Sequence, residues 1–222
     1  MKVGEIVTRV KAAIDELRQN GTALLSESED EQNLSQIIVD KIGYALQYVI
    51  ENAPLEKLDS SLFESPTSEE LATFSIADDL KGTVTLPTDV LRIIEARLSS
   101  WSHFPVPEAA TSQIYQMQQD KYARGSWDRP VNILTFEGGE KKLEMYCAKT
   151  AEDKLILTFI RQPKLDIPAD DDHEVPVPSQ LDAALVYQVA GLTMIAFREE
   201  LATSLFAIAK RYLDPDGVKS EE

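Results

Sequence analysis

The chain has 222 residues, of which 43% are hydrophobic, and carries a formal net charge of −16 from 38 acidic and 22 basic side chains. This size and apolar content are enough for one large domain or two small ones. The acid excess argues against a protein that grips nucleic-acid phosphates broadly, because no surplus of cations is present to neutralise them.

One cysteine excludes an internal disulfide framework and fits a reducing cytosol, and two histidines leave almost no material for a His/Cys metal site. No signal peptide is expected, because residues 1–17 are amphipathic and charged. The most apolar stretch, 181–197, contains Asp182 and Gln188 and is too short for a membrane span. We therefore expect a soluble protein that has no membrane partner.

Two amphipathic helices are predicted before residue 54. The first covers about 3–18 and the second about 34–52, with an acidic loop at 26–33 between them and Pro54 at the end. Their apolar positions recur at helical spacing. These positions are Ile6, Val10, Ile14 and Leu17 in the first helix, and Ile38, Ile42, Ala45, Leu46 and Val49 in the second. The apolar faces of both helices must be covered by elements from later in the chain.

A β-rich insertion is predicted over about 83–162. Its entry is Leu86-Pro87-Thr88-Asp89, where Pro87 pushes the preceding residue toward an extended conformation. The run 86–98 fits a strand or a helical face by periodicity, and the entering proline and the pair Ile93-Ile94 favour a strand. Residues 108–124 are expected to form a short helix or a loop.

Three further runs alternate or are rich in β-branched residues. The run 131–136 ends in Glu137-Gly138-Gly139, which predicts a tight turn into the strand 141–148. A short linker that contains Glu152 and Asp153 leads to the run 154–160. This spacing predicts that 141–148 and 154–160 form an antiparallel hairpin.

The C-terminal part is expected to be one long helix over 179–213, followed by an exposed tail at 214–222. Residues 183–197 are apolar or small at almost every position, so this helix should be covered on several sides at the centre of the core. The predicted fold is therefore α+β: a single domain over 1–213, built as a helical bundle with a long central C-terminal helix and a small antiparallel sheet.

No catalytic, cofactor-binding or metal-binding residue is predicted, and the chain is not expected to be an enzyme. The cluster Asp170-Asp171-Asp172-His173-Glu174 lacks the spacing of a calcium loop, because consecutive side chains do not easily converge on one ion. Cys147 lies in mid-strand on an apparently buried face, where a cysteine usually acts as a small hydrophobe.

One region interleaves aromatic and basic residues. Aromatic side chains at Trp101, Phe104, Tyr115, Tyr122 and Trp127 accompany Arg97, Lys121, Arg124 and Arg129. Such a group can stack nucleobases, but Trp, Tyr and Arg are also the usual anchors of protein contact patches. A protein interface is the preferred interpretation.

The order of these features resembles the head-to-tail connector proteins of tailed bacteriophages. The resemblance covers about residues 80–213. It rests on Leu86-Pro87-Thr88-Asp89, the tryptophan-bearing segment, the pattern KKLEMYC…KLILTFIRQPKL, and Val177-Pro178 before ALVYQVAGLTMIAFRE. The acidic inserts at 26–33 and 54–80 lengthen the chain and suggest a larger ring protein, such as those in the collar of crAss-like phages.

The resemblance implies a structural virion protein at the head–tail junction, made in the host cytoplasm. It would form a homo-oligomeric ring, commonly of twelve copies, that binds the portal protein and other tail or collar proteins and extends the DNA channel. DNA would pass without specific binding, and Tyr212, Leu213 and the tail would reach toward the portal. The alternative from the residues alone is an acidic binding or regulatory protein that acts by itself and mimics the charge of DNA.

Overall fold

The computed structural model describes residues 1–16, 28–120 and 122–214, and its fold is mixed α+β. Contacts divide the chain into two compact units: a helical unit of Met1–Asp59 and Pro163–Glu222, and a β unit of Ser60–Gln162. The sequence predicted one domain with a β-rich insertion from about residue 83. The β unit begins earlier because the backbone at Glu64 pairs with Phe159 in the strand Leu155–Arg161.

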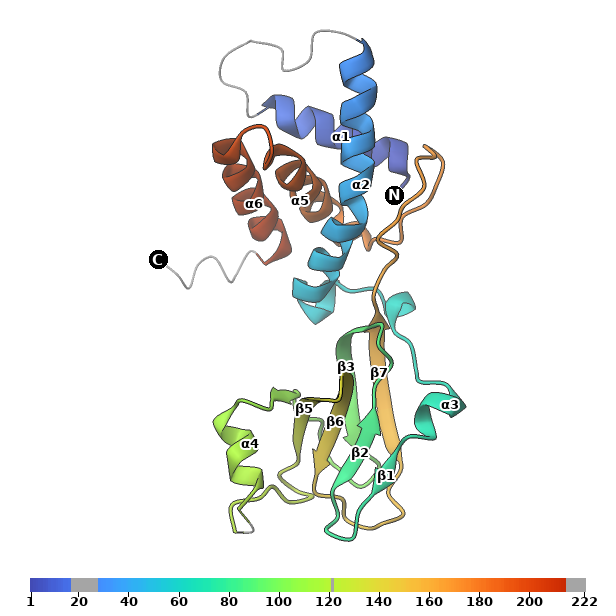
Figure 1. The fold of residues 1–222 in the computed structure, drawn as a ribbon, viewed down its shortest axis with the longest axis vertical. Coiled ribbons are helices and arrows are strands. Elements are labelled where there is room, and N and C mark those ends of the chain that lie inside the picture. The colour runs from blue at the N-terminus through green and yellow to red at the C-terminus, as the bar shows by residue number, and fades with distance from the viewer. Residues whose placement is uncertain (17–27, 121, 215–222) are drawn as a thin grey trace. The chain divides into compact units, whose positions relative to one another are not determined.

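The helical unit is built around one short helix. Helix α5 (Asp182–Met194) packs against α1 (Val3–Glu16), α2 (Ser28–Asn52) and α6 (Glu199–Leu213) (Figure 1). Nine of its 13 residues are buried, so it is covered on several sides, as the apolar run at 183–197 predicted. The 3-10 turns η1 (Leu55–Lys57) and η3 (Ser179–Leu181) complete the unit.

The two predicted N-terminal helices are present with their apolar stripes inside. Ile6, Val10 and Ile14 are buried, whereas Leu17 lies outside the described residues. All five predicted stripe positions of α2 are buried as well. Helix α2 begins at Ser28, so most of the predicted acidic loop is helical.

The prediction of one helix over 179–213 is wrong. The helix ends at Met194 and a new helix starts at Glu199, with Arg198 in an extended conformation between them. The chain folds back here so that α6 covers another side of α5. Gly191 permits this packing, because a Cβ atom there would lie 2.5 Å from the ring of Phe206.

The segment 163–178, called the return segment below, leads from the β unit to α5 along the first residues of the chain. Val3 N–H donates to His173 O at 3.0 Å and Gly4 N–H donates to Asp171 O at 3.1 Å. The segment also passes directly over α2, where a Cβ atom at Gly43 would lie 2.6 Å from Leu165 Cα. The glycine in α2 is therefore required by the close approach of another backbone.

The β unit consists of two small sheets. The five-stranded sheet has the order β1 (Ser75–Ile76), β2 (Gly82–Thr85), β6 (Glu140–Tyr146), β5 (Val131–Glu137) and β4 (Glu108–Ala109). The two-stranded sheet pairs β3 (Val90–Leu98) with β7 (Leu155–Arg161), so 86–98 contains the predicted strand. Their buried side chains form one core, which includes Leu86, Leu98, Trp101, Leu143, Met145, Leu157 and Phe159. The turn η2 (Ser60–Leu62) and helices α3 (Ser68–Leu71) and α4 (Gln113–Gln118) lie in the connections.

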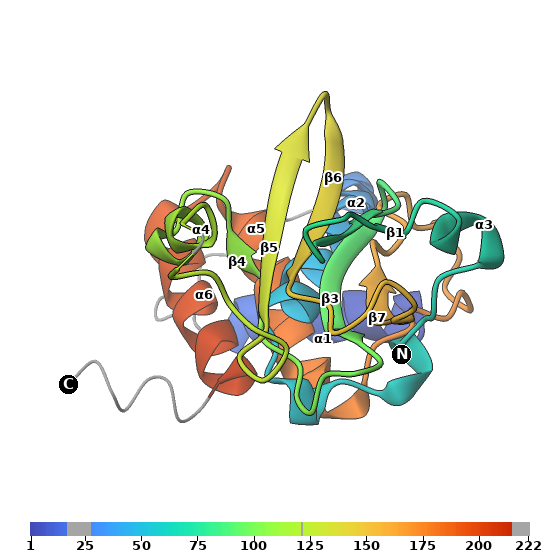
Figure 2. The same cartoon turned by 90° about the horizontal axis from the view of Figure 1, so that it is seen from below.

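The β5–β6 hairpin is confirmed, and it extends beyond the neighbouring strands in Figure 2. Its turn needs glycine, because Gly138 and Gly139 have φ values of 63° and 88°. The predicted hairpin between 141–148 and 154–160 is wrong. Strand β6 pairs with β2 and β5, whereas β7 pairs with β3 in the other sheet, so the linker 147–154 crosses between the sheets.

Arg161, at the end of β7, holds three separate segments of the β unit together. Its guanidinium contacts Asp89 Oδ1 at 2.7 Å, Glu64 Oε2 at 2.8 Å and Glu70 Oε1 at 2.8 Å. The hydrogen bond from Arg161 lowers the pKa of Glu70 below its usual value. Asp89, the last residue of the predicted entry Leu86-Pro87-Thr88-Asp89, is therefore held by two interactions. Besides the ion pair with Arg161, its carbonyl oxygen accepts a hydrogen bond of 2.7 Å from Gln162 N–H.

The crossing of α2 by the return segment can be tested with Gly43→Ala. We expect a loss of about 1–3 kcal/mol in the free energy of unfolding from overpacking against backbone atoms. This loss would occur although alanine favours a helix over glycine by about 1 kcal/mol. Urea unfolding measures the change. Gly191→Ala is the matched control, because its neighbour is the ring of Phe206, a side chain that can move. Equal effects of the two substitutions would contradict the close backbone contact.

Candidate interaction surface

Three loops that are far apart in the sequence meet at one end of the β unit. They are residues 99–106, 122–129 and 147–154, called the loop cluster below. The indole N–H of Trp101 donates to Cys147 O at 3.0 Å, and Cys147 Sγ donates to Gly125 O at 2.9 Å. Ser100 Oγ donates to Asp153 Oδ2 at 2.7 Å. The structure therefore brings most of the predicted aromatic and basic region together.

Trp101 belongs to the interior of this cluster and not to its surface. Its side chain is 2% exposed and packs in the core of the β unit. A buried indole N–H needs an acceptor, and the carbonyl of Cys147 supplies one. Trp101 was predicted as an interface residue, but its side chain is buried and connects the loops to the core of the β unit.

Four large apolar side chains project from the cluster into solvent. Phe104 is 54% exposed, Val106 80%, Tyr122 96% and Trp127 46%. The first two flank Pro105, whose carbonyl accepts a hydrogen bond of 3.1 Å from Nδ2 of Asn132. The same amide nitrogen donates to Ala96 O at 2.7 Å. This buried amide fixes the loop, so both apolar side chains face outward.

Cations accompany the exposed aromatic side chains. Lys149 Nζ lies 4.5 Å from the ring centroid of Trp127, within the range of a cation–π interaction. Neither Lys149 nor the exposed Arg129 has a carboxylate within salt-bridge distance among the residues that the structure describes. Asp128 accepts a hydrogen bond from Ser126 Oγ, which lowers the pKa of its carboxyl group. The cluster therefore places two cations beside apolar rings, and one of them, Arg129, also interacts electrostatically with Asp128.

Arg124 and Tyr115 make contacts with other residues of the β unit. Arg124 donates to Asp79 Oδ2 at 3.0 Å and to Gln118 O at 3.1 Å, and its guanidinium lies 5.6 Å from the ring centroid of Tyr146. Tyr115 is half-buried on α4, where its N–H donates to Ser112 Oγ at 3.2 Å. Arg124 is thus engaged within the β unit.

The remaining predicted interface residues, Tyr212 and Leu213, lie in the helical unit. Leu213 is buried, whereas Tyr212 is 48% exposed and stacks on Tyr187 with ring centroids 5.6 Å apart. Lys57 Nζ donates to the carbonyl oxygens of both residues, at 2.9 and 2.8 Å. Tyr212 also borders a hollow of about 240 Å³ beside Arg9. The rest of the predicted tail lies outside the described residues.

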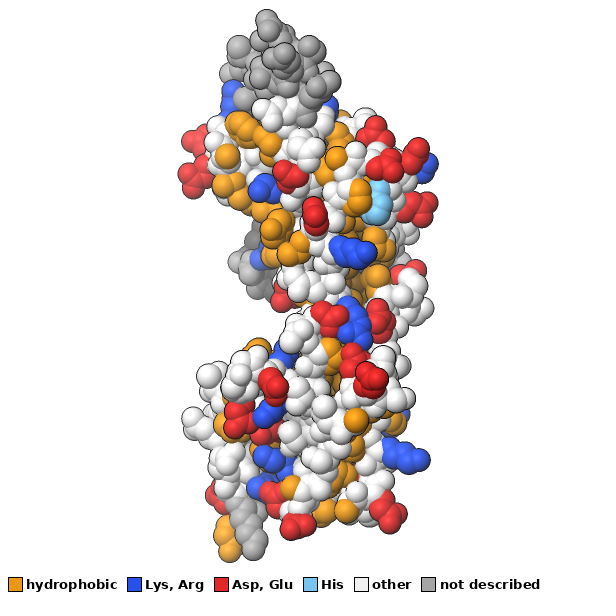
Figure 3. Space-filling model, turned by 45° about the vertical axis from the view of Figure 1, so that its right-hand side comes forward, with side chains coloured by type: hydrophobic (Ala, Val, Ile, Leu, Met, Phe, Trp, Pro, Cys, Tyr) orange, Lys and Arg blue, Asp and Glu red, His pale blue; other side chains and the backbone are white. Residues whose placement is uncertain are grey.

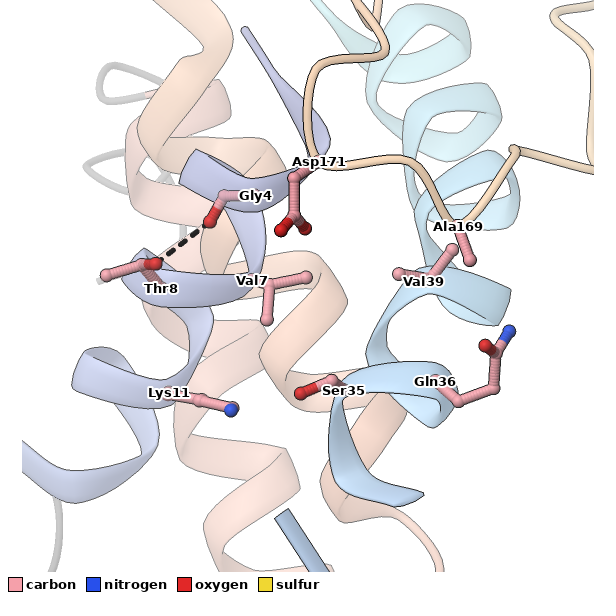
Figure 4. Close-up of a pocket in the computed structure, with 9 residues that line it drawn as sticks. All are labelled: Gly4, Val7, Thr8, Lys11, Ser35, Gln36, Val39, Ala169 and Asp171. Atoms are coloured by element: carbon pink, nitrogen blue, oxygen red, sulfur yellow. Dashed lines mark hydrogen bonds between the residues drawn. The ribbon is translucent and has the colours of Figure 1, made fainter. Parts of the chain in front are cut away.

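A larger hollow of about 400 Å³ lies between α1, α2 and residues 169–171 of the return segment (Figure 4). Val7 and Val39 give it an apolar wall, and Lys11 extends from α1 toward α2. Asp171 borders it from the return segment, and Thr8, Ser35 and Gln36 add polar groups. No ion pair to Lys11 or Asp171 occurs within the described part of the chain. The volume is in the range of ligand pockets.

The cysteine and the possible metal ligands that were considered for chemistry show no reactive arrangement in the described residues. Burial raises the pKa of the Cys147 thiol, which favours its neutral form. Over residues 1–16, 28–120 and 122–214, no three His, Cys, Asp or Glu side chains are arranged to hold a metal ion. In the same residues no helix is long and apolar enough to cross a membrane.

Two members of the cluster were missed by sequence reasoning. Val106 lies between Pro105 and Pro107, and flanking prolines favour an extended chain that can leave an apolar side chain in solvent. Lys149 lies three residues after the end of β6, and no local pattern indicates its contact with Trp127. Comparison of the sequence with known protein families finds no match, and comparison with curated proteins finds none either.

The loop cluster depends on the carboxylate of Asp153, which is 9% exposed. Burial acts to raise its pKa. The hydrogen bonds from Ser100 Oγ and from the N–H groups of Lys149 and Thr150 outweigh burial, so the pKa is lowered overall. Since the pKa is lower in the folded state, this stabilisation is present above the unfolded-state pKa of about 3.9. It is lost as the pH falls through the folded-state pKa.

We expect Asp153→Asn to lower the free energy of unfolding by about 1.5–3 kcal/mol at pH 7, the usual range for hydrogen bonds to a charged group. Urea unfolding at pH 7 and near pH 3 measures the change, and the difference from the parent chain should shrink at the lower pH. Glu152→Gln, at the exposed neighbouring residue, is the control and should have little effect. A difference that stays constant with pH would contradict the role of the charge.

Proposed function

We propose that the protein is a structural ring component that joins the portal of a phage capsid to the tail and extends the DNA channel. The observation that carries the proposal is the order of the elements. Helices α1 and α2 precede the β unit, α5 and α6 follow it, and α1, α2 and α6 pack around α5. This order agrees with the expected connector pattern in its N-terminal helical region and its small sheet, whereas the one long C-terminal helix of that pattern is divided here into α5 and α6.

The loop cluster supports an assembly role. Phe104 and Val106 lie on a loop that hydrogen bonds from Trp101 and Asn132 tie to the rest of the β unit, so this part of the surface is held in place in the single chain. Exposed aromatic side chains on a rigid frame are typical anchors of protein contacts. A ring built from identical chains needs two different contact surfaces on each chain. The loop cluster is proposed as one of them.

The charge distribution supports passage of DNA without binding. The two segments of the helical unit contain 23 acidic and 11 basic residues, whereas the β unit contains 15 acidic and 11 basic residues. The acid excess is therefore concentrated in the helical unit. A wall with this charge repels the phosphate backbone, since no cation surplus is present to replace the counterions of DNA.

Electron microscopy of the purified chain, alone and mixed with the portal protein from the same genome, tests the proposal. We expect a closed ring or added density on the portal, and no binding of duplex DNA at about 0.15 M salt. A small particle that ignores the portal in every condition would contradict the ring. It would favour an acidic regulator that acts alone.

The contact role of the loop cluster can be tested in the same assay. We expect Phe104→Ser to weaken ring assembly about 10-fold to 100-fold, the range for loss of an apolar anchor at an interface. Phe136→Ser is the matched control, because Phe136 is 72% exposed on the β5–β6 hairpin. Equal effects of the two changes would argue against a specific role of the loop cluster.

A further inference from the structure

We propose that the 400 Å³ hollow of one copy receives the side chain of Tyr122 from the loop cluster of a second copy. In this contact Arg129 and Lys149 of the second copy lie against the acidic part of the return segment, residues 170–174. The inference rests on the proposed ring and assigns both surfaces of its repeating contact.

The hollow matches an aromatic side chain with a polar end. Val7 and Val39 can contact the faces of a ring, and the carboxylate of Asp171 can accept a hydrogen bond from a hydroxyl group (Figure 4). A buried tyrosine needs a hydrogen-bond partner for its hydroxyl group, so these neighbours favour tyrosine over a purely apolar side chain. Tyr122 is 96% exposed in the single chain, which leaves its whole ring available.

Individual cations of the loop cluster can pair with carboxylates of the return segment. The acidic stretch of the return segment carries four carboxylates within five residues, and Figure 3 shows acidic side chains over the helical unit. One of the four, Asp172, pairs with Lys2 at 2.7 Å. Asp171 and Glu174 have no cation partner among the described residues. The loop cluster supplies Arg129 and Lys149, with Asp128 and Glu152 as the nearest exposed acids in sequence.

The contact is heterologous, because the hollow and the inserted side chain of Tyr122, called the knob below, belong to different surfaces of the chain. Chains of net charge −16 repel one another, so a stable contact between copies must bring unlike charges together locally. A heterologous contact leaves one free hollow and one free knob after each addition. It therefore builds a ring when the rotation closes, and does not stop at a two-fold dimer.

Paired charge reversals test this contact. We expect Asp171→Arg or Arg129→Asp to weaken ring assembly about tenfold each, and the double variant Asp171→Arg/Arg129→Asp to recover most of the loss. Glu56→Arg is the control, because it makes the same charge change at an exposed acid elsewhere in the helical unit. Sedimentation velocity and electron microscopy measure assembly, with the portal present where the parent chain needs it.

Two changes to the knob and the hollow test the insertion itself. We expect Tyr122→Ser to weaken assembly about 30-fold, as for an interface anchor. Thr8→Trp, which fills the hollow from α1, should have a similar effect. Both positions are exposed, so thermal unfolding should stay close to that of the parent chain.

The outcomes separate the two proposals. A parent ring that tolerates all of these variants overturns the knob-and-hollow contact and leaves the ring intact. A double reversal no better than the single reversals also overturns it. A parent chain that never assembles, with or without the portal, overturns the ring and this contact together.

Discussion

The organisation of the chain follows from the need to cover α5 on several sides. Nine of its 13 residues are buried, so an isolated α5 would expose a large apolar surface. The helices that cover it come from both ends of the chain: α1 and α2 precede the β unit, and α6 follows α5. The β unit can therefore be inserted between α2 and α5 without interrupting the helical core. It has its own core between two sheets, so each unit buries its apolar residues by itself.

Local patterns predicted much of the fold, and long-range contacts explain the errors. Helical spacing identified the buried faces of α1 and α2, and the Gly138-Gly139 turn identified the β5–β6 hairpin. The break after Met194 has no proline or glycine at the junction, and it is understood only through the packing of α6 on α5. Likewise, β6 and β7 are neighbours in sequence, but β6 finds β2 and β5 while β7 finds β3.

The location of the loop cluster was predictable from the sequence, but the exposure of its side chains was not. Sequence reasoning found the aromatic and basic region, because residue types are visible in a sequence. Whether a side chain is exposed depends on partners from distant segments. The carbonyl of Cys147 accepts from Trp101 inside the β unit, and Asp79 engages Arg124. Lys149 reaches Trp127 only because the linker 147–154 crosses between the sheets.

The acid excess and the proposed assembly are compatible because screening limits the range of charge. At physiological ionic strength the Debye length is about 8 Å, so two acidic chains repel mainly where their surfaces meet. A contact that places Arg129 and Lys149 against carboxylates removes this repulsion locally, while the remaining acids face solvent. The same short range applies to DNA in the proposed channel. An acidic wall would act on the phosphate backbone only within about one Debye length, which prevents adhesion without resisting passage along the axis.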